Sequence, residues 1–280
     1  MNSNKKDADQ IVQFYRLIRE YQAEMSRSAD GEVSHINNFG YWLPACRNLF
    51  DAEMALFDLI IGMLSPLEEG MKGVDIGCGL GGYAVRLLER YPVSLVCYDL
   101  LEEHLAEARE FADERHVTNR LTAIQGNSMQ MDSIENASLD FAYNIESSFH
   151  YDDKQIFFNE VARILKPGGV FVYADLSCED ATKVTFKSGN FFSSKQELET
   201  LMSGAGLTVE EHLDIAPEVY IPLKQYKEYF DQEMTSVSSR LRKARVVKYW
   251  DLVLNNYIKL FITQTTLSQG FCCTSYYNFV

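Results

Sequence analysis

Short apolar runs alternate with amphipathic stretches from residue 71 onward. Five runs have the length and residue types of buried strands, at 71–76, 93–98, 120–125, 139–144 and 169–175. Helical patterns lie between and after them, at 81–90, 101–115, 152–165 and 194–205. This alternation predicts right-handed βαβ units, and therefore a mostly parallel sheet with helices on both faces.

The flanking segments extend this core. Apolar residues recur at helical spacing over 8–28 and 48–64, so residues 1–64 are predicted to form an N-terminal helical cap. After the core, 207–214 is predicted to be a sixth strand, 217–265 a helical lid and 270–280 a last strand. The expected architecture is α/β, with a Rossmann-like, seven-stranded, mostly parallel sheet in one domain over 65–280.

Composition narrows the class of protein. The chain has 280 residues, 46% of them hydrophobic, and a net charge of −14, so a surface this acidic repels phosphate backbones. No apolar run is long enough to span a bilayer, and the N-terminus is too polar for a secretory signal. The six cysteines show no CxxC spacing, which favours reduced thiols. We expect a cytoplasmic protein with a small-molecule substrate, no nucleic acid and no stable membrane insertion; a homodimer is left open.

The segment VDIGCGLGG, residues 74–82, follows a predicted strand and opens a predicted helix. Gly77, Gly79 and Gly82 fit the pattern GxGxxG, in which glycines permit a tight turn and close backbone approach to a ligand. A tight turn without a ligand is the alternative interpretation. The context around the loop therefore has to decide between the two.

Two acidic residues narrow the class of ligand that the glycine loop is expected to bind. Asp99 ends the second strand 22 residues after Gly77, a spacing suited to accepting hydrogen bonds from ribose hydroxyls, or to capping the next helix. Asp75 lies two residues before the first glycine, where its carboxylate would repel a dinucleotide pyrophosphate and suit an ammonium or sulfonium group. The alternative for Asp75 is a hydrogen-bonded acid at a strand end.

Together with LDFAYNIESSFHYDD (139–153) and VARILKPGGVFVYAD (161–175), this loop resembles class I S-adenosylmethionine-dependent methyltransferases. The segment NNFGYW before the core is similar to the N-terminal segment of their small-molecule group, which includes sterol, tocopherol, phthiotriol-type and antibiotic-tailoring enzymes. The resemblance implies S-adenosylmethionine as cofactor and S-adenosylhomocysteine as product.

The resemblance also implies contacts for each part of the cofactor. These are Asp75, Gly77, Cys78 and Gly79 for the methionine part, Asp99 for the ribose, Leu100 for the adenine, and Asn144 and Ile145 beside the sulfonium. Asn127 and Ser128 stand where the family usually has an acid that binds the adenine amino group. An asparagine oxygen also accepts from an amino group, so Asn127 is expected to do so.

His150 and Glu146 are the candidate catalytic residues. His150 lies just past the fourth strand, at the sheet edge where such folds bind ligands, and is predicted to be a general base. A loop histidine with structural hydrogen bonds is the alternative. Glu146 is expected to orient His150 or to contact cofactor or substrate, unless it only caps the loop.

Tyr41, Trp42 and His35 are the candidate substrate-binding residues, and their rings are expected to form a wall over the acceptor. The alternative interpretation is that these rings only pack within the N-terminal cap. No histidine spacing suggests a metal site. We expect methyl transfer to a hydroxyl oxygen of a secondary metabolite, with carbon second and nitrogen third. A nicotinamide-dependent oxidoreductase and an inert cofactor-binding partner protein are the alternatives from other classes.

Overall fold

The computed structural model describes residues 26–64, 66–180, 189–233 and 258–268. The helix expected over 8–28 and the strand expected over 270–280 therefore lie largely or wholly outside the described residues. Where 8–28 enters the described part it is not helical, because Arg27 forms a β-bridge with Val33.

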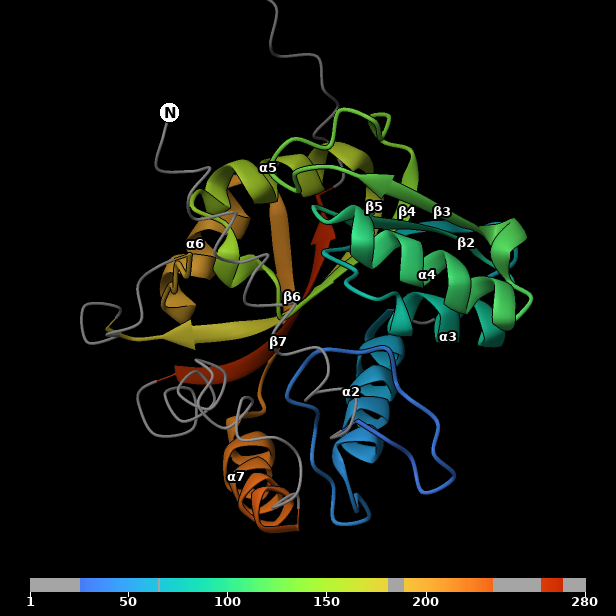
Figure 1. The fold of residues 1–280 in the computed structure, drawn as a ribbon. Coiled ribbons are helices and arrows are strands. Elements are labelled where there is room, and N and C mark those ends of the chain that lie inside the picture. The colour runs from blue at the N-terminus through green and yellow to red at the C-terminus, as the bar shows by residue number, and fades with distance from the viewer. Residues whose placement is uncertain (1–25, 65, 181–188, 234–257, 269–280) are drawn as a thin grey trace, which may run out of the picture.

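A seven-stranded sheet forms the centre of the molecule (Figure 1). Its strands are β1 (Lys72–Ile76), β2 (Ser94–Asp99), β3 (Leu121–Gln125), β4 (Leu139–Ile145), β5 (Leu165–Cys178), β6 (Leu207–Asp214) and β7 (Ile258–Leu267). Their order is β3-β2-β1-β4-β5-β7-β6, and only β7 runs antiparallel to its neighbours. The expected seven-stranded, mostly parallel α/β sheet is confirmed.

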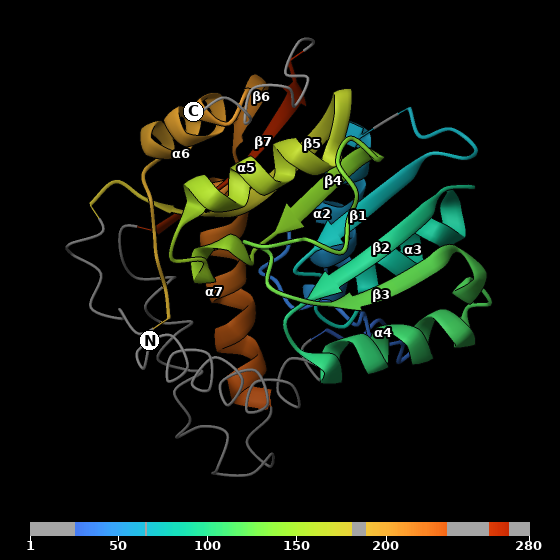
Figure 2. The ribbon, with the colours of Figure 1, turned by 90° about the horizontal axis from the view of Figure 1, so that it is seen from above.

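Helices cover both faces of the sheet (Figure 2). The described helices are α2 (Leu49–Leu64), α3 (Gly82–Arg90), α4 (Glu102–Glu114), α5 (Lys154–Ile164), α6 (Lys195–Gly204) and α7 (Ala216–Glu233), with short 3-10 turns η1 (Thr118–Arg120) and η2 (Ser148–His150). One apolar cluster joins α2, α3, α4 and α7 to the sheet, and a second joins α5 and α6 to it. The two clusters are the buried layers that a parallel sheet requires.

The late helical segment is shorter than expected. Helix α7 begins as predicted, and 234–257 lies outside the described residues, but the expectation that the helix continues to residue 265 is wrong. Residues Ile258–Leu267 form β7, which pairs with β5 on one side and β6 on the other. This central position buries Ile262, Thr263 and Thr265, β-branched residues that favour a strand.

The described part of the N-terminal cap packs directly on the sheet domain. Leu56 and Phe57 of α2 are fully buried in the same cluster as Val172 of β5. The segment before α2 lies on that helix, because the Tyr41 amide donates to the Ala52 carbonyl at 2.8 Å. The cap thereby brings its aromatic segment close to the carboxyl ends of the central strands.

Candidate functional site

The carboxyl ends of the parallel strands meet at one edge, and the glycine loop between β1 and α3 lies there. Gly77 and Gly79 both have positive φ, +73° and +53°, a conformation that other residues adopt at a cost. The amides of Gly77 and Cys78 donate to the carbonyl of Tyr98, at 2.7 and 3.2 Å. These bonds hold the loop, including the half-buried Cys78, against the end of β2.

Gly77 and Gly79 give a matched pair of substitutions. In Gly77→Ala the new Cβ would lie 2.2 Å from Ser147 Oγ, whereas in Gly79→Ala it meets nothing within 4 Å. Both variants bear about 1–2 kcal/mol of left-handed strain, but only Gly77→Ala adds a clash. We expect the larger fall in thermal midpoint for Gly77→Ala, measured by circular dichroism. Equal falls would show that Ser147 moves away at no cost.

Asp99 ties the glycine loop to the start of α4. Its Oδ2 accepts from the Gly79 amide and its Oδ1 from the Leu101 amide, both at 2.9 Å, and His104 Nδ1 lies 3.2 Å from Oδ1. The neighbouring Leu100 side chain is 47% exposed. Asp99 thus closes a turn onto Leu101, the residue before α4, but it does not cap the helix, which has no side-chain cap hydrogen bond. It also sets the position of the loop beside an exposed apolar surface.

Asp75 lies below the glycine loop and is 4% exposed. On β1 it pairs with Cys97 of β2 on one side and with Tyr143 of β4 on the other. Burial raises the pKa of Asp75 to about 8; the Tyr143 hydroxyl opposes this rise and the Asp99 charge adds to it. At pH 7 the carboxyl group is therefore mainly neutral, and a cation brought beside it would favour its ionised form.

A chain of hydrogen bonds crosses the end of β4. Asn144 Nδ2 donates to the Ile76 carbonyl at 2.8 Å and to Ser147 Oγ at 2.6 Å. Tyr151 Oη lies 2.8 Å from Ser147 Oγ and donates to Ser128 Oγ at 3.1 Å. In the described part of the chain, Asn144 Oδ1 is buried without a hydrogen-bond partner. The adjacent Ile145 is partly buried against the core.

Ser147 and Tyr151 were missed by sequence reasoning, which considered only His150 and Glu146 in this loop. The signal that could have identified them is the presence of hydroxyl side chains in the segment that follows β4, beside Glu146 and His150. Their network joins the β4 end to Ser128 after β3, so it links two of the predicted cofactor-binding segments.

Glu146 is buried in a left-handed conformation, with φ +45°. Both of its carboxyl oxygens lie 3.2 Å from the Phe39 amide. Burial raises the pKa of Glu146 well above its usual range; the Phe39 amide opposes this rise, and Asp175 and Glu53 add to it. Burial therefore favours the neutral form of Glu146, and the side chain anchors the aromatic segment to the edge of the sheet.

His150 ends η2 and is partly buried. Its Nδ1 lies 2.7 Å from the Gly189 carbonyl oxygen, which only accepts, so Nδ1 carries the proton and Nε2 holds the lone pair. Burial lowers the pKa of His150 to about 4. The hydrogen bond to Gly189 opposes this fall, and the charge of Lys154 adds to it. The imidazole is thus neutral at physiological pH, in the tautomer that accepts a proton at Nε2, although as a weak base.

The three aromatic candidates before α2 have different surroundings. The Trp42 amide donates to the Glu218 carbonyl at 2.9 Å, and its ring lies 5.1 Å from that of Tyr226, so it joins this segment to α7. Tyr41 beside it is partly buried. The His35 ring instead stacks on Phe111 of α4 at 4.1 Å. The structure thus brings Tyr41 and Trp42 into the segment that Glu146 anchors, and gives His35 a packing contact on α4.

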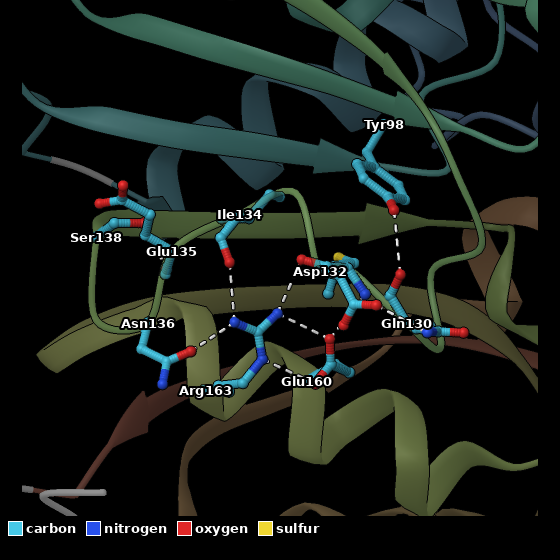
Figure 3. Close-up of polar contacts among 10 residues, drawn as sticks. Tyr98, Gln130, Asp132, Ile134, Glu135, Asn136, Ser138, Glu160 and Arg163 are labelled. Atoms are coloured by element: carbon cyan, nitrogen blue, oxygen red, sulfur yellow. Dashed lines mark hydrogen bonds and ion pairs between the residues drawn. The ribbon is translucent and has the colours of Figure 1, made fainter.

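The loop after β3 is held by one arginine of α5 (Figure 3). Arg163 donates to the carbonyls of Met131 and Ile134 at 2.9 and 2.8 Å, and to Asn136 Oδ1 at 2.6 Å. It also forms two 2.8 Å bonds to Glu160, whose Oε2 accepts from the Met131 amide at 2.7 Å. Glu160 and Arg163 therefore fix both backbone groups of Met131, just past Asn127 and Ser128.

Arg163→Lys tests this positioning role, with Arg120→Lys as its control. Arg120 also donates to backbone carbonyls, those of Leu88, Tyr91 and Val93, but lies at the opposite end of β3. Because the lysine ammonium cannot reproduce the planar set of donors of a guanidinium group, we expect both variants to lower the thermal midpoint. Only Arg163→Lys should raise KM for S-adenosylmethionine, about fivefold, with kcat nearly unchanged. Equal KM values in the two variants would remove this role.

Among the residues that the structure describes, no three His, Cys, Asp or Glu side chains lie close enough together to hold a metal ion. Within the same part of the chain, no helix has both the length and the apolar character needed to cross a bilayer.

Residues 74–173 match a family model described as "Methyltransferase domain". The chain is also similar to erythromycin 3''-O-methyltransferase of Saccharopolyspora erythraea, with 32% identity over 162 residues, which is 58% of this chain and 52% of that protein. The chain spans about half the length, or less, of the first curated relatives it matches.

Two solved structures show the same fold. One is the cyclase SpnF, with a TM-score of 0.76, 19% identity, and coverage of 93% of this chain and 96% of that chain. The other is geranyl diphosphate C-methyltransferase from Streptomyces coelicolor A3(2), in complex with S-adenosylhomocysteine. Its TM-score is 0.70, with 17% identity and coverage of 91% and 97%. At these identities the likeness shows the fold alone, and the cyclase illustrates that one fold hosts different reactions.

The family match and the sheet order together confirm the predicted class. Residues 74–173 form a class I S-adenosylmethionine-dependent methyltransferase domain.

Proposed function

We propose that the protein transfers a methyl group from S-adenosylmethionine to a small molecule at the carboxyl edge of the sheet. The observation that carries the proposal is Asp75, a carboxyl group 4% exposed below a glycine loop. A buried acid at this place disfavours a diphosphate and favours a ligand with ammonium and sulfonium charges. The methyltransferase relatives support the same reaction class.

The residues at this edge fit that cofactor. Nothing lies within 4 Å of the position where Gly79 would carry a Cβ, so its backbone is open to a ligand. Asp99 is placed to accept from ribose hydroxyls with its remaining lone pairs, and the exposed side chain of Leu100 offers an apolar surface to a nucleobase. Asn144 Oδ1 is a buried acceptor beside the loop.

When bound, the cofactor supplies a methyl carbon attached to a positively charged sulfur. We propose that His150 serves acceptors with a hydroxyl group; the relative erythromycin 3''-O-methyltransferase is named for transfer to oxygen. Its Nε2 takes the hydroxyl proton while the oxygen–carbon bond forms and the carbon–sulfur bond breaks. Tyr41 and Trp42, held near the edge by the contact between Phe39 and Glu146, would exclude water from this space.

Transfer to carbon is the second candidate. The observation that favours it is the burial of His150, which lowers its pKa to about 4 and makes it a weak base for an ordinary hydroxyl. A carbon acceptor such as an alkene needs no base before its bond to the methyl group forms. The similarly folded geranyl diphosphate C-methyltransferase is named for transfer to carbon.

The test uses the full chain with S-adenosylmethionine labelled in its methyl group and a panel of hydroxylated and isoprenoid acceptors. We expect labelled product together with S-adenosylhomocysteine, and the carbon chemical shift of the transferred methyl separates oxygen from carbon transfer. Equilibrium dialysis is the measurement that could contradict the proposal. Binding of NAD but not of S-adenosylmethionine would overturn it.

A further inference from the structure

Lys154 is the first residue of helix α5 and is buried, with 6% of the residue exposed. Its Nζ donates to the carbonyl oxygen of Tyr151, at 3.4 Å, and to that of Phe191. A buried ammonium group is costly, and a positive charge in the first turn of a helix opposes the helix dipole. Helix formation therefore gives no reason for a lysine at this position, and its contacts have to supply one.

The contact with Phe191 holds a short segment against the 3-10 turn η2. The Phe191 amide donates to the Phe149 carbonyl at 2.6 Å, while the Phe191 carbonyl accepts from Lys154. Two residues earlier in the chain, the Gly189 carbonyl oxygen lies 2.7 Å from His150 Nδ1. Lys154 and His150 are thus joined through the backbone from Gly189 to Phe191.

The direction of the Gly189 carbonyl is not set by local backbone preference. Gly189 has φ +72°, and a glycine adopts left-handed and right-handed conformations about equally well. Contacts further along the segment have to fix it: the two bonds at Phe191, and the Cys178 amide donating to the Ser193 carbonyl at 3.0 Å. Among these bonds only that of Lys154 comes from a side chain, so it is the one that a substitution can remove.

The charge of Lys154 acts on the same imidazole. It adds to the lowering of the pKa of His150 by burial, whereas the Gly189 bond and the charge of Asp99 oppose that lowering. Three acidic residues face Lys154 itself and oppose the lowering of its own pKa by burial: Asp175, Glu197 and Asp152. Lys154 therefore affects His150 in two ways, through the backbone segment that it binds and through its charge.

We propose that Lys154 is a positioning residue for His150, an inference that rests on the proposed function. By binding the Phe191 carbonyl, Lys154 keeps the Gly189 carbonyl on Nδ1 of the imidazole, which leaves Nε2 as the atom that takes the hydroxyl proton. Its charge also disfavours protonation of the imidazole before the acceptor is bound. In this role Lys154 acts through His150 and takes no proton itself.

The test is nuclear magnetic resonance of the full chain with nitrogen-15 histidine, in the native protein and in Lys154→Met. Imidazole nitrogen shifts report which nitrogen carries the proton and the pKa, and the spectrum of His150→Asn assigns the signal. In the native protein we expect the proton on Nδ1 and no titration above about pH 5. In Lys154→Met we expect both tautomers and a pKa of about 5 or higher, because the charge is lost and water reaches the ring.

Lys166→Met is the matched control. It makes the same change at a lysine whose Nζ donates to Asp140 at 2.6 Å, at the amino edge of the sheet. We expect this variant to keep the native His150 signal. Lys154→Gln is the second variant if Lys154→Met does not fold; its side chain is shorter and uncharged, so the pKa of His150 should rise in the same direction, by less.

Kinetics add a second readout once the labelling assay has identified a hydroxyl acceptor. Lys154→Met should lower kcat about tenfold and leave KM for S-adenosylmethionine within about twofold, since only the base is displaced. A native tautomer and pKa of His150 in the Lys154 variant that folds would overturn the inference, and so would an equal change in Lys166→Met. A native protein that transfers no methyl group would reject the proposed function instead, while the spectra would still show whether Lys154 holds His150.

Discussion

Replacing His150 by alanine is expected to lower kcat for a hydroxyl acceptor about 100-fold, with little change in cofactor affinity. This value is at the low end for a general base, because burial lowers the pKa of His150 to about 4 and weakens it as a proton acceptor. The measurement is steady-state kinetics with S-adenosylmethionine and the acceptor identified by the labelling assay. A carbon acceptor should show a much smaller loss.

His150→Asn separates the base from its structural contact. An asparagine amide can still donate to the Gly189 carbonyl, but it cannot take a proton. We expect the asparagine variant to recover thermal stability relative to alanine while its kcat stays as low. Native kcat in the asparagine variant would assign His150 to positioning alone.

The pH profile gives an independent check on the same base. Only the neutral imidazole accepts a proton, so activity is lost as pH falls through the pKa of the folded enzyme. Because that pKa is about 4, kcat should be nearly constant from pH 8 down to about pH 5 and should decline at lower pH. A decline centred near the ordinary histidine value of about 6.5 would contradict the effect of burial.

Asp99→Ala is expected to raise the Kd for S-adenosylhomocysteine about 10- to 100-fold. The substitution removes the acceptor for ribose hydroxyls and also releases the Gly79 and Leu101 amides, so the glycine loop loses its anchor. Calorimetric titration of the two proteins measures the change. Unaltered affinity would show that the ribose is bound elsewhere.

Asp140→Ala is the matched control for Asp99. The Asp140 carboxylate also accepts from a backbone amide, that of Lys72 at 2.8 Å, and pairs with Lys166 at 2.6 Å, but it lies at the amino edge of the sheet. We expect this variant to lose stability while keeping its cofactor affinity. A similar loss of affinity in both variants would mean that Asp99 acts through general destabilisation.

Local pattern was sufficient for most of the sheet. Strands β1 to β4 are short apolar runs separated by helices or turns, so their sequence pattern predicts them within a residue or two. The residues of β7 give no such signal, because the apolar pattern over 217–265 predicts a helix where the structure has the strand Ile258–Leu267. Its identity depends on pairing with β5 and β6, which lie 80 or more and about 45 residues earlier in the chain.

The candidate site divides in the same way. The sequence was enough to single out the glycine loop with Asp75 and Asp99, because spacing along one βαβ unit fixes their relative positions. It did not reveal that Glu146 anchors Phe39, or that Arg163 secures the turn carrying Asn127. These contacts join residues 107 and about 30 positions apart, and no local rule encodes them.

By itself, then, the sequence determined the class of fold and the place where a charged nucleoside ligand would bind, since both follow from short-range periodicity and spacing. Only the tertiary structure decided which acids are buried with raised pKa values, which imidazole nitrogen of His150 carries the proton, and which backbone amide donates to the Asn127 oxygen. The physical reason is that desolvation and hydrogen-bond partners set these properties, and both arise when distant segments are packed together.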